Sequence, residues 1–231
     1  MSDTDTDSTR LNKFLALHNG ISRRQADELI EKGNVTVNGH VAVIGGRVKE
    51  GDDVFVRGKK VDDTTKKIYV AFHKPVNYVC SRKQQGDSPT IYDLLPTKYH
   101  ALKPVGRLDR DSSGVILLTN DGDFALRMTH PRYGKTKRYE VTLNAPLEPL
   151  HQQMIGDFGV DLDDGTSKLA LERVDDDRKD WIVTMSEGRN RQIRRTFASL
   201  GYIVVKLHRT DFGNYRLGGL KPGEYEETSV S

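Results

Sequence analysis

Residues 58–67, GKKVDDTTKK, are the stretch that most constrains the fold, because they are polar and show neither a helical nor a strand period. Amphipathic segments lie on both sides of this stretch. Such a break predicts a linker between two separately folded units. We therefore expect a disordered, acidic tail over residues 1–9, a small unit over residues 10–57, a linker over residues 58–67 and a second domain over residues 68–231.

The small unit has the pattern of two helices followed by a hairpin. RLNKFLALHNG predicts a short amphipathic helix, and SRRQADELIEKG opens with Ser22 and Gln25 at the spacing of a capping box. In VTVNGHVAV, two short alternating strands flank Asn38 and Gly39, a pair that favours a type I′ turn. GDDVFVRG predicts one further strand.

Strands dominate the second domain. IYVAFHKP, VILLT, TKRYEVTL, WIVTMSE and YIVVKL each predict a strand, whereas DFALRMTH and NRQIRRTFASLG predict helices. In TKRYEVTL, the alternation places Tyr139, Val141 and Leu143 on one face. The fold class predicted for the whole chain is α+β, with a mixed, mainly antiparallel sheet in the second domain.

Composition narrows the class of protein. The net charge is +3, with 35% hydrophobic and 30% charged residues, which is ordinary for a globular chain. The one cysteine, Cys80, excludes an intrachain disulfide, and it fits a packed thiol better than a nucleophile. The polar start is unlike a signal peptide, and no apolar run reaches the ~20 residues that span a bilayer. We expect a monomer in the reducing cytoplasm.

A cluster of arginines follows the strand WIVTMSE. EGRNRQIRR, residues 187–195, holds four arginines in nine positions. On a helix that starts near Asn190, Arg191 and Arg195 face solvent, whereas Arg194 lies at the edge of the apolar stripe. A guanidinium held there requires a carboxylate or phosphate partner. A structural salt bridge is the alternative interpretation.

Two further basic clusters indicate nucleic-acid binding. The first lies at the two helix starts of the small unit, where backbone N–H groups also favour phosphate: Arg10, Lys13, Arg23 and Arg24. A solvated charged face remains the alternative there, since the second helix also carries acids. In HPRYGKTKRY, four basic residues are interleaved with Tyr133 and Tyr139. Protein surfaces that bind single-stranded nucleobases have the same combination. Tyr139 is either a core residue or a pocket wall.

Four motifs in order resemble those of pseudouridine synthases. They are HKPVNYVCS, GRLDRDSSGVILLTNDGD, KRYEVTL, and EGRNRQIRRTF followed by VVKLHR, and residues 10–57 resemble an S4 RNA-binding domain. This order is similar to that of the RsuA family, which modifies ribosomal RNA. One departure is Asn77, where the family usually has glycine, and a turn accepts asparagine at positive φ.

The resemblance implies a role for several residues. Asp109, in GRLD, is expected to be the catalytic carboxylate, with Arg194 holding it ionised and oriented. Tyr139 is expected to stack on the target uracil, and Arg107 to help extrude the nucleotide. The remaining expected RNA contacts are Lys74, Lys137, Arg189 and Arg191, together with the four basic residues of the small unit.

Uridine isomerisation requires no redox step, so we expect no cofactor and no metal. Asp111 is expected in a turn or as a helix cap, and Asp121 and Asp123 as helix caps in preference to cation ligands. Asp163-Asp164-Gly165 predicts a hairpin turn. The histidines are scattered without ligand spacing.

The expected partner is ribosomal RNA or a ribosome assembly intermediate, with 23S favoured over 16S because EGRNRQIRR resembles the large-subunit branches. The alternative function is an S4-type RNA-binding or assembly factor with an inert synthase domain. A transfer or messenger RNA substrate is a weaker alternative. The presence of Asp109, Tyr139 and Arg194 together favours the enzyme.

Overall fold

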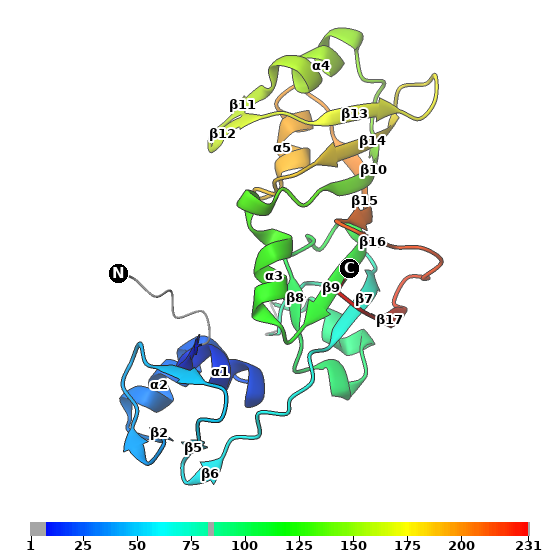
Figure 1. The fold of residues 1–231 in the computed structure, drawn as a ribbon. Helices are drawn as coiled ribbons and strands as arrows, with labels where there is room; N and C mark the ends of the chain where they lie inside the picture. Colours follow the sequence, from blue (N-terminus) through cyan, green and yellow to red (C-terminus); the bar gives the residue numbers. More distant parts are fainter. Residues whose placement is uncertain (1–7, 83–85, 231) are drawn as a thin grey trace. The chain divides into compact units, whose positions relative to one another are not determined.

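A computed structural model describes residues 8–82 and 86–230, which divide into two compact units (Figure 1). The first unit extends to Lys67 and includes Asn120–Gly122, and the second comprises Ile68–Thr119 and the chain from Asp123 onward. Each unit has its own hydrophobic core. Among the helices of the described residues, none is both long and apolar enough to cross a membrane.

The first unit packs two helices against short antiparallel strands. Its elements are β1 (Ser8–Arg10), α1 (Leu11–His18), α2 (Arg23–Glu31), β2 (Val35–Val37), β3 (His40–Val41), β4 (Arg47–Lys49), β5 (Val54–Val56) and β6 (Lys59–Lys60). The strand order is β3-β2-β5-β6 in one sheet, and β1 pairs with β4 in another. The capping box is confirmed, since Ser22 Oγ accepts from Gln25 N at 3.1 Å and Gln25 Oε1 accepts from Ser22 N at 2.8 Å. Asn38 and Gly39 have φ values of 52° and 81°, as a type I′ turn requires.

Two boundaries differ from the sequence-based prediction. Residues 1–7 of the predicted tail lie outside the described residues, but Ser8 and Thr9 pair with β4 and are therefore strand residues. The predicted linker starts too early, because Lys59–Lys60 pair with β5 and Val61 is buried in the core of the first unit. We therefore propose a linker over residues 62–67 only.

The second unit is built on a mixed sheet with the order β13-β14-β10-β15-β9-β7-β17, to which β8 and β16 add at β9 and β15. The strands are β7 (Tyr69–Lys74), β8 (Lys103–Val105), β9 (Ser113–Thr119), β10 (Lys137–Leu143), β13 (Ala170–Arg173), β14 (Asp180–Met185), β15 (Val204–Phe212), β16 (Tyr215–Arg216) and β17 (Tyr225–Thr228). Only the pair β15 and β9 is parallel in the described sheet, so the predicted mixed, mainly antiparallel architecture is confirmed. Strand β17, which pairs with β7, was not predicted.

Short helices cover the two faces of this sheet. They are α3 (Gly122–Thr129), α4 (Pro149–Gln153) and α5 (Gln192–Ala198), with 3₁₀ turns η1 (Ile91–Leu94), η2 (Thr97–Tyr99) and η3 (Pro131–Tyr133) and the π-helical segment η4 (Met154–Phe158). Successive residues of β9 alternate between two cores: Ile116 packs in the core that contains Phe197 of α5, and Leu117 in the core that contains Phe124 of α3. Helices α5 and α3 therefore lie on opposite faces of the sheet.

The predicted inward face of β10 is confirmed. Tyr139, Val141 and Leu143 are all buried. The hairpin predicted at Asp163-Asp164-Gly165 also forms, between β11 (Val160–Leu162) and β12 (Gly165–Ser167). Beyond β12, the chain returns to the main sheet and then to α5.

Candidate active site

The loop between β8 and β9 carries Asp109, and several contacts fix its backbone. Asn77 N donates to the carbonyl of Arg110 at 2.7 Å. Asn77 has a φ of 70°, so the expected positive φ is confirmed. The thiol of Cys80 donates to the carbonyl of Leu108 at 3.3 Å and accepts from its N–H at 3.4 Å. The loop thus holds Asp109 in one position, with its side chain 34% exposed.

Lys74 fastens the other end of this loop. Its ammonium group donates to the carbonyl oxygens of Ser112, at 2.6 Å, and Pro75, at 2.9 Å. We expected Lys74 to contact RNA, but the residue is fully buried, and its ammonium group is enclosed by the loop whose carbonyl oxygens it binds. Burial lowers the pKa of Lys74 to about 8, although Cys80, Asp109 and Asp111 act in the opposite direction. The residue therefore supports the loop from within.

Arg191 precedes α5 in a left-handed backbone conformation, with a φ of 45°. Its guanidinium donates one hydrogen bond to each carboxylate oxygen of Asp111, both at 3.1 Å. The same guanidinium lies 3.5 Å from Oδ2 of Asp109. Arg191 is therefore the cation that faces Asp109 directly.

Arg194 has a different set of partners from the one we expected. Its guanidinium donates to the carbonyl oxygens of Val204, at 2.7 Å, and Asp111, at 2.9 Å, and its Nε lies 3.3 Å from Oδ2 of Asp111. The side chain is 12% exposed, as its position at the edge of the apolar stripe predicts. Its ion pair in the structure is with Asp111, whereas the ion pair of Asp109 is with Arg191. The sequence left open a carboxylate or phosphate partner for Arg194 or a structural salt bridge. Each interpretation fits in part, because the partner is the carboxylate of Asp111 and the ion pair is partly buried.

Asp111 lies in a turn, as expected, and receives both arginines. Burial alone would raise its pKa, but the hydrogen bonds from Arg191 and the charge of Arg194 outweigh this effect and lower the pKa. The same pairing raises the pKa of Arg191. Asp111 is therefore an anionic anchor for the cations beside Asp109.

Asp109 opens onto a pocket of about 250 Å³. The pocket is lined by the loop of Asp109, by the segment before α5 and by inward-facing residues of β10 and β15: Arg107, Asp109, Lys137, Tyr139, Arg191 and Arg209. Tyr139 is 7% exposed and so belongs both to the core and to the pocket wall. A carboxylate, an aromatic face and several cations thus surround one cavity.

The other predicted RNA contacts divide by exposure. Arg107 and the small-unit residues Arg10, Arg23 and Arg24 are exposed, and Lys13 is half-buried. Arg189 is largely engaged within the protein, because its guanidinium donates to Asp164 and to the carbonyls of Gly165 and Thr166. Lys137 is buried at the pocket instead of lying on the surface.

Sequence reasoning did not single out Arg209. The residue is 2% exposed and lines the pocket from β15. A signal was present, since Arg209 follows the buried Leu207 by two positions, and residues two apart on a strand share a face. An arginine on the apolar face of a strand is an indication of a binding site.

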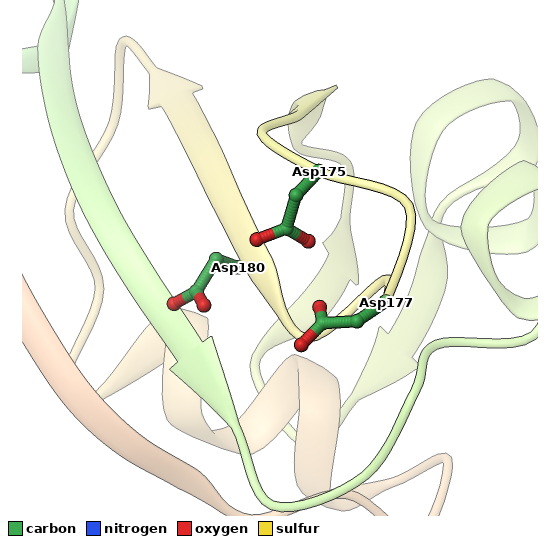
Figure 2. Close-up of side chains that lie close together, drawn as sticks. All are labelled: Asp175, Asp177 and Asp180. Atoms are coloured by element: carbon green, nitrogen blue, oxygen red, sulfur yellow. The ribbon is translucent and has the colours of Figure 1, made fainter.

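A separate group of acids lies at the turn between β13 and β14. Figure 2 shows the carboxylates of Asp175, Asp177 and Asp180 gathered there, all within 4.8 Å of one another. Asp177 accepts from the N–H of Lys179 at 2.8 Å, and Asp180 accepts from the hydroxyl of Thr142. A hydrogen bond with Asp177 and its charge raise the pKa of Asp175. These hydrogen bonds give the acidic residues a structural role in the turn that joins β13 to β14.

Asp121 and Asp123 lie where α3 begins. Asp121 is buried and forms an ion pair with Lys67 at 3.0 Å, so its carboxylate has a structural partner. Asp123 is in the first turn of the helix, where an acid is favourable.

Comparison with known proteins relates both units to established families. The sequence model for RNA pseudouridylate synthases matches residues 68–199, and the S4 domain model matches residues 9–54. The chain is 39% identical to ribosomal small subunit pseudouridine synthase A of Pasteurella multocida (strain Pm70), covering 96% of each protein. It is 35% identical to ribosomal large subunit pseudouridine synthase B of Bacillus subtilis (strain 168), covering 94% of this chain and 91% of the relative.

A third relative is the dual-specificity RNA pseudouridine synthase RluF of Escherichia coli (strain K12), which is 36% identical and has 75% of its length covered. Among solved structures, a crystal structure of a pseudouridylate synthase matches with a TM-score of 0.68 and 34% identity, over 95% of this chain and 96% of that one.

Proposed function

Because this chain belongs to the RNA pseudouridylate synthase family and carries an S4 domain ahead of the synthase domain, we propose that it isomerises uridine to pseudouridine at a specific site in ribosomal RNA, with Asp109 as the catalytic carboxylate. The reaction breaks the N1–C1′ bond of uridine, forms a C5–C1′ bond and releases the proton on C5. The observation that carries the proposal is the juxtaposition of Asp109, Arg191 and Tyr139 around one pocket.

Each residue has a distinct role in this proposal. Asp109 acts on the sugar or the base of the extruded nucleotide, and Arg191 gives its carboxylate a cationic partner 3.5 Å away. Tyr139 offers a ring on which the uracil stacks. Arg107 is exposed at the pocket and helps to hold the nucleotide out of the RNA helix.

Arg194 acts through the loop. Its bonds to the backbone and carboxylate of Asp111 fix the turn that follows Asp109. Its role is therefore to position the catalytic carboxylate, and Arg191 provides the direct contact. The reaction is an isomerisation without net oxidation or reduction, so the proposal includes no cofactor.

The substrate is ribosomal RNA, free or in an assembly intermediate. The names of the relatives include small-subunit, large-subunit and dual-specificity enzymes, so they favour neither RNA. We retain large-subunit RNA as the favoured substrate because of the segment EGRNRQIRR. The exposed arginines Arg10, Arg23 and Arg24 of the S4 domain bind phosphates of this RNA. They supply affinity without contacting nucleobases.

Tritium release tests the function directly. Ribosomal RNA labelled with tritium at uridine C5 loses the label when the C5–C1′ bond forms. We expect release by the wild type and none by Asp109→Asn, while RNA affinity stays within about threefold. Asp176→Asn removes an almost fully exposed carboxylate outside the pocket and serves as the matched control.

The competing function, an RNA-binding module with an inert synthase domain, predicts the opposite result. No release by the wild type from 16S RNA, 23S RNA or ribosomal particles would favour it. Loss of RNA binding by a folded Asp109→Asn variant would contradict the role given to Asp109.

A further inference from the structure

Two cations are buried side by side in the pocket. Lys137 of β10 is 9% exposed and Arg209 of β15 is 2% exposed, and both line the same cavity as Asp109. Both lie against the ring of Phe212, with Nζ of Lys137 at 5.5 Å and the guanidinium carbon of Arg209 at 4.7 Å from its centre. Their burial places them deeper than Asp109 and Arg191, whose side chains are 34% and 44% exposed.

Neither cation has a carboxylate partner within the parts of the chain that the structure describes. Nζ of Lys137 donates to the carbonyl of Glu187 at 3.2 Å, and Nε of Arg209 donates to the carbonyl of Val115 at 2.8 Å. One terminal nitrogen of Arg209 is buried and makes no hydrogen bond. Burial and the neighbouring Arg209 lower the pKa of Lys137, and together they outweigh the charge of Glu187, which acts in the opposite direction.

Buried charges without counter-ions are costly, and natural proteins retain them mainly where a ligand completes the site. The ligand that fits here must be electron-rich and must enter a pocket that also has an aromatic wall. An RNA phosphate remains attached to the backbone and so stays near the exposed entrance, where Arg107 lies. A nucleobase is the part of an extruded nucleotide that reaches deeper.

We propose that Lys137 and Arg209 bind the carbonyl oxygens of the extruded uracil and stabilise the negative charge that the base acquires during the reaction. This inference rests on the proposed function. It assigns the two residues a catalytic role, as donors already in place where charge develops.

The charge arises on either chemical route. If the N1–C1′ bond breaks first, its electron pair leaves with the base and is shared among N1, O2 and O4. If a carboxylate oxygen of Asp109 first adds to C6, the electron pair of the C5–C6 double bond moves toward O4. On the first route, C5 then bonds to C1′. On the second route, the N1–C1′ bond breaks as C5 bonds to C1′, and the oxygen of Asp109 then leaves C6 with the electron pair of the C6–O bond. On both routes the proton on C5 passes to solvent, N1 takes up a proton, and the uracil returns to neutrality with its C5–C6 double bond restored.

Methionine variants test the proposal. Lys137→Met and Arg209→Met remove the charge at similar length, and Lys206→Met and Arg173→Met make the same changes at exposed cations paired with Glu140 and Asp176. The readout is the single-turnover rate of tritium release from 16S and 23S transcripts labelled at uridine C5, at saturating enzyme. RNA affinity is measured in parallel as a function of salt concentration.

We expect the rate to fall roughly 100-fold in each pocket variant and to stay unchanged in the controls. RNA affinity and its salt dependence should match the wild type. Lys137→Arg and Arg209→Lys, which keep the charge, should recover a large part of the rate. If a methionine variant melts well below the wild type, Lys137→Gln or Arg209→Gln replaces it, and the same rate criterion decides.

Two results would overturn the proposal. One is a rate equal to that of the controls. The other is an unchanged saturating rate with a salt slope shallower by about one, which would show that the cation contacts a phosphate. Failure of the proposed function is a separate result, because it would leave the wild type itself without tritium release.

Discussion

Asp111 holds Arg191 through both of its carboxylate oxygens, at 3.1 Å each, and Arg191 in turn lies 3.5 Å from Asp109. The carboxylate of Asp111 thus fixes the cation that faces Asp109. Asp111 also lies 3.3 Å from Nε of Arg194, so one anion orients two guanidinium groups. A paired charge of this kind gives geometric specificity as well as energy.

Asp111→Asn is predicted to slow the reaction through this relationship. The variant removes the charge that holds both arginines, but Asp111 is 48% exposed, so solvent screening limits the loss. We expect a fall of about tenfold in the saturating rate, equivalent to about 1.4 kcal/mol, with RNA affinity unchanged. Single-turnover tritium release measures this effect, and Asp176→Asn is its control. A rate equal to that of the control would contradict the positioning role.

Lys74 predicts a rise in stability with pH. Its folded-state pKa of about 8 lies below the ordinary value of 10.5, so the unfolded chain binds more protons between these values. The folded protein carries the full cost of the buried charge below pH 8, and this cost disappears as pH rises through the window. Relative to Lys74→Met, the unfolding free energy of the wild type should increase by up to about 3 kcal/mol.

Urea denaturation of both proteins at roughly pH 7 and roughly pH 10 measures this difference. The comparison with Lys74→Met removes the contributions of tyrosines and other lysines that titrate in the same range. A difference that stays constant across the window would show that Lys74 keeps an ordinary affinity for its proton.

Local features of the fold followed from the sequence. The capping box of Ser22 and Gln25 and the turn at Asn38 and Gly39 depend on neighbouring residues, so their spacing was sufficient to predict them. The alternation that places Tyr139 inward was equally local. The strand formed by Ser8 and Thr9 was not predictable in this way, because its partner β4 lies about forty residues further along the chain.

The candidate site shows the same limit. The helical period placed Arg194 correctly at the edge of the apolar stripe, but a period defines a face and not a partner. Arg191 is exposed, as the helical wheel predicted, but its left-handed conformation before α5 turns its guanidinium toward Asp109, which the wheel does not show. Lys74 is the last residue of β7, and only the tertiary fold, which brings the carbonyl of Ser112 to its ammonium group, shows that it is enclosed.

The hydrogen bonds between Cys80 and the backbone of Leu108 predict that removing the thiol slows the reaction. Burial raises the pKa of its thiol, which stays protonated and can both donate to and accept from Leu108, the residue before Asp109. In Cys80→Ala, both backbone groups of Leu108 lose this partner, at about 1 kcal/mol each. We expect the saturating rate to fall severalfold, with a smaller loss in Cys80→Ser, whose hydroxyl can replace both bonds. Equal rates in all three proteins would contradict this role.

The S4 domain should contribute RNA affinity in proportion to the phosphates it contacts. Arg23 and Arg24 are exposed at the start of α2, where the backbone N–H groups of the first turn also favour an anion. In the full-length chain, Arg23→Gln combined with Arg24→Gln should reduce the dependence of log affinity on log salt by about 1.4 to 1.8, because each phosphate contact adds about 0.7 to 0.9 to the slope.

The matched control removes the same two positive charges from the synthase domain. Arg173→Gln with Lys206→Gln changes net charge equally, at two exposed cations outside the pocket. If the S4 variant loses slope and affinity while its saturating rate stays at the wild-type value, the S4 domain binds RNA and takes no part in the chemistry. Equal slopes in the two double variants would show that the effect is one of net charge, and that Arg23 and Arg24 form a solvated surface instead of a phosphate contact.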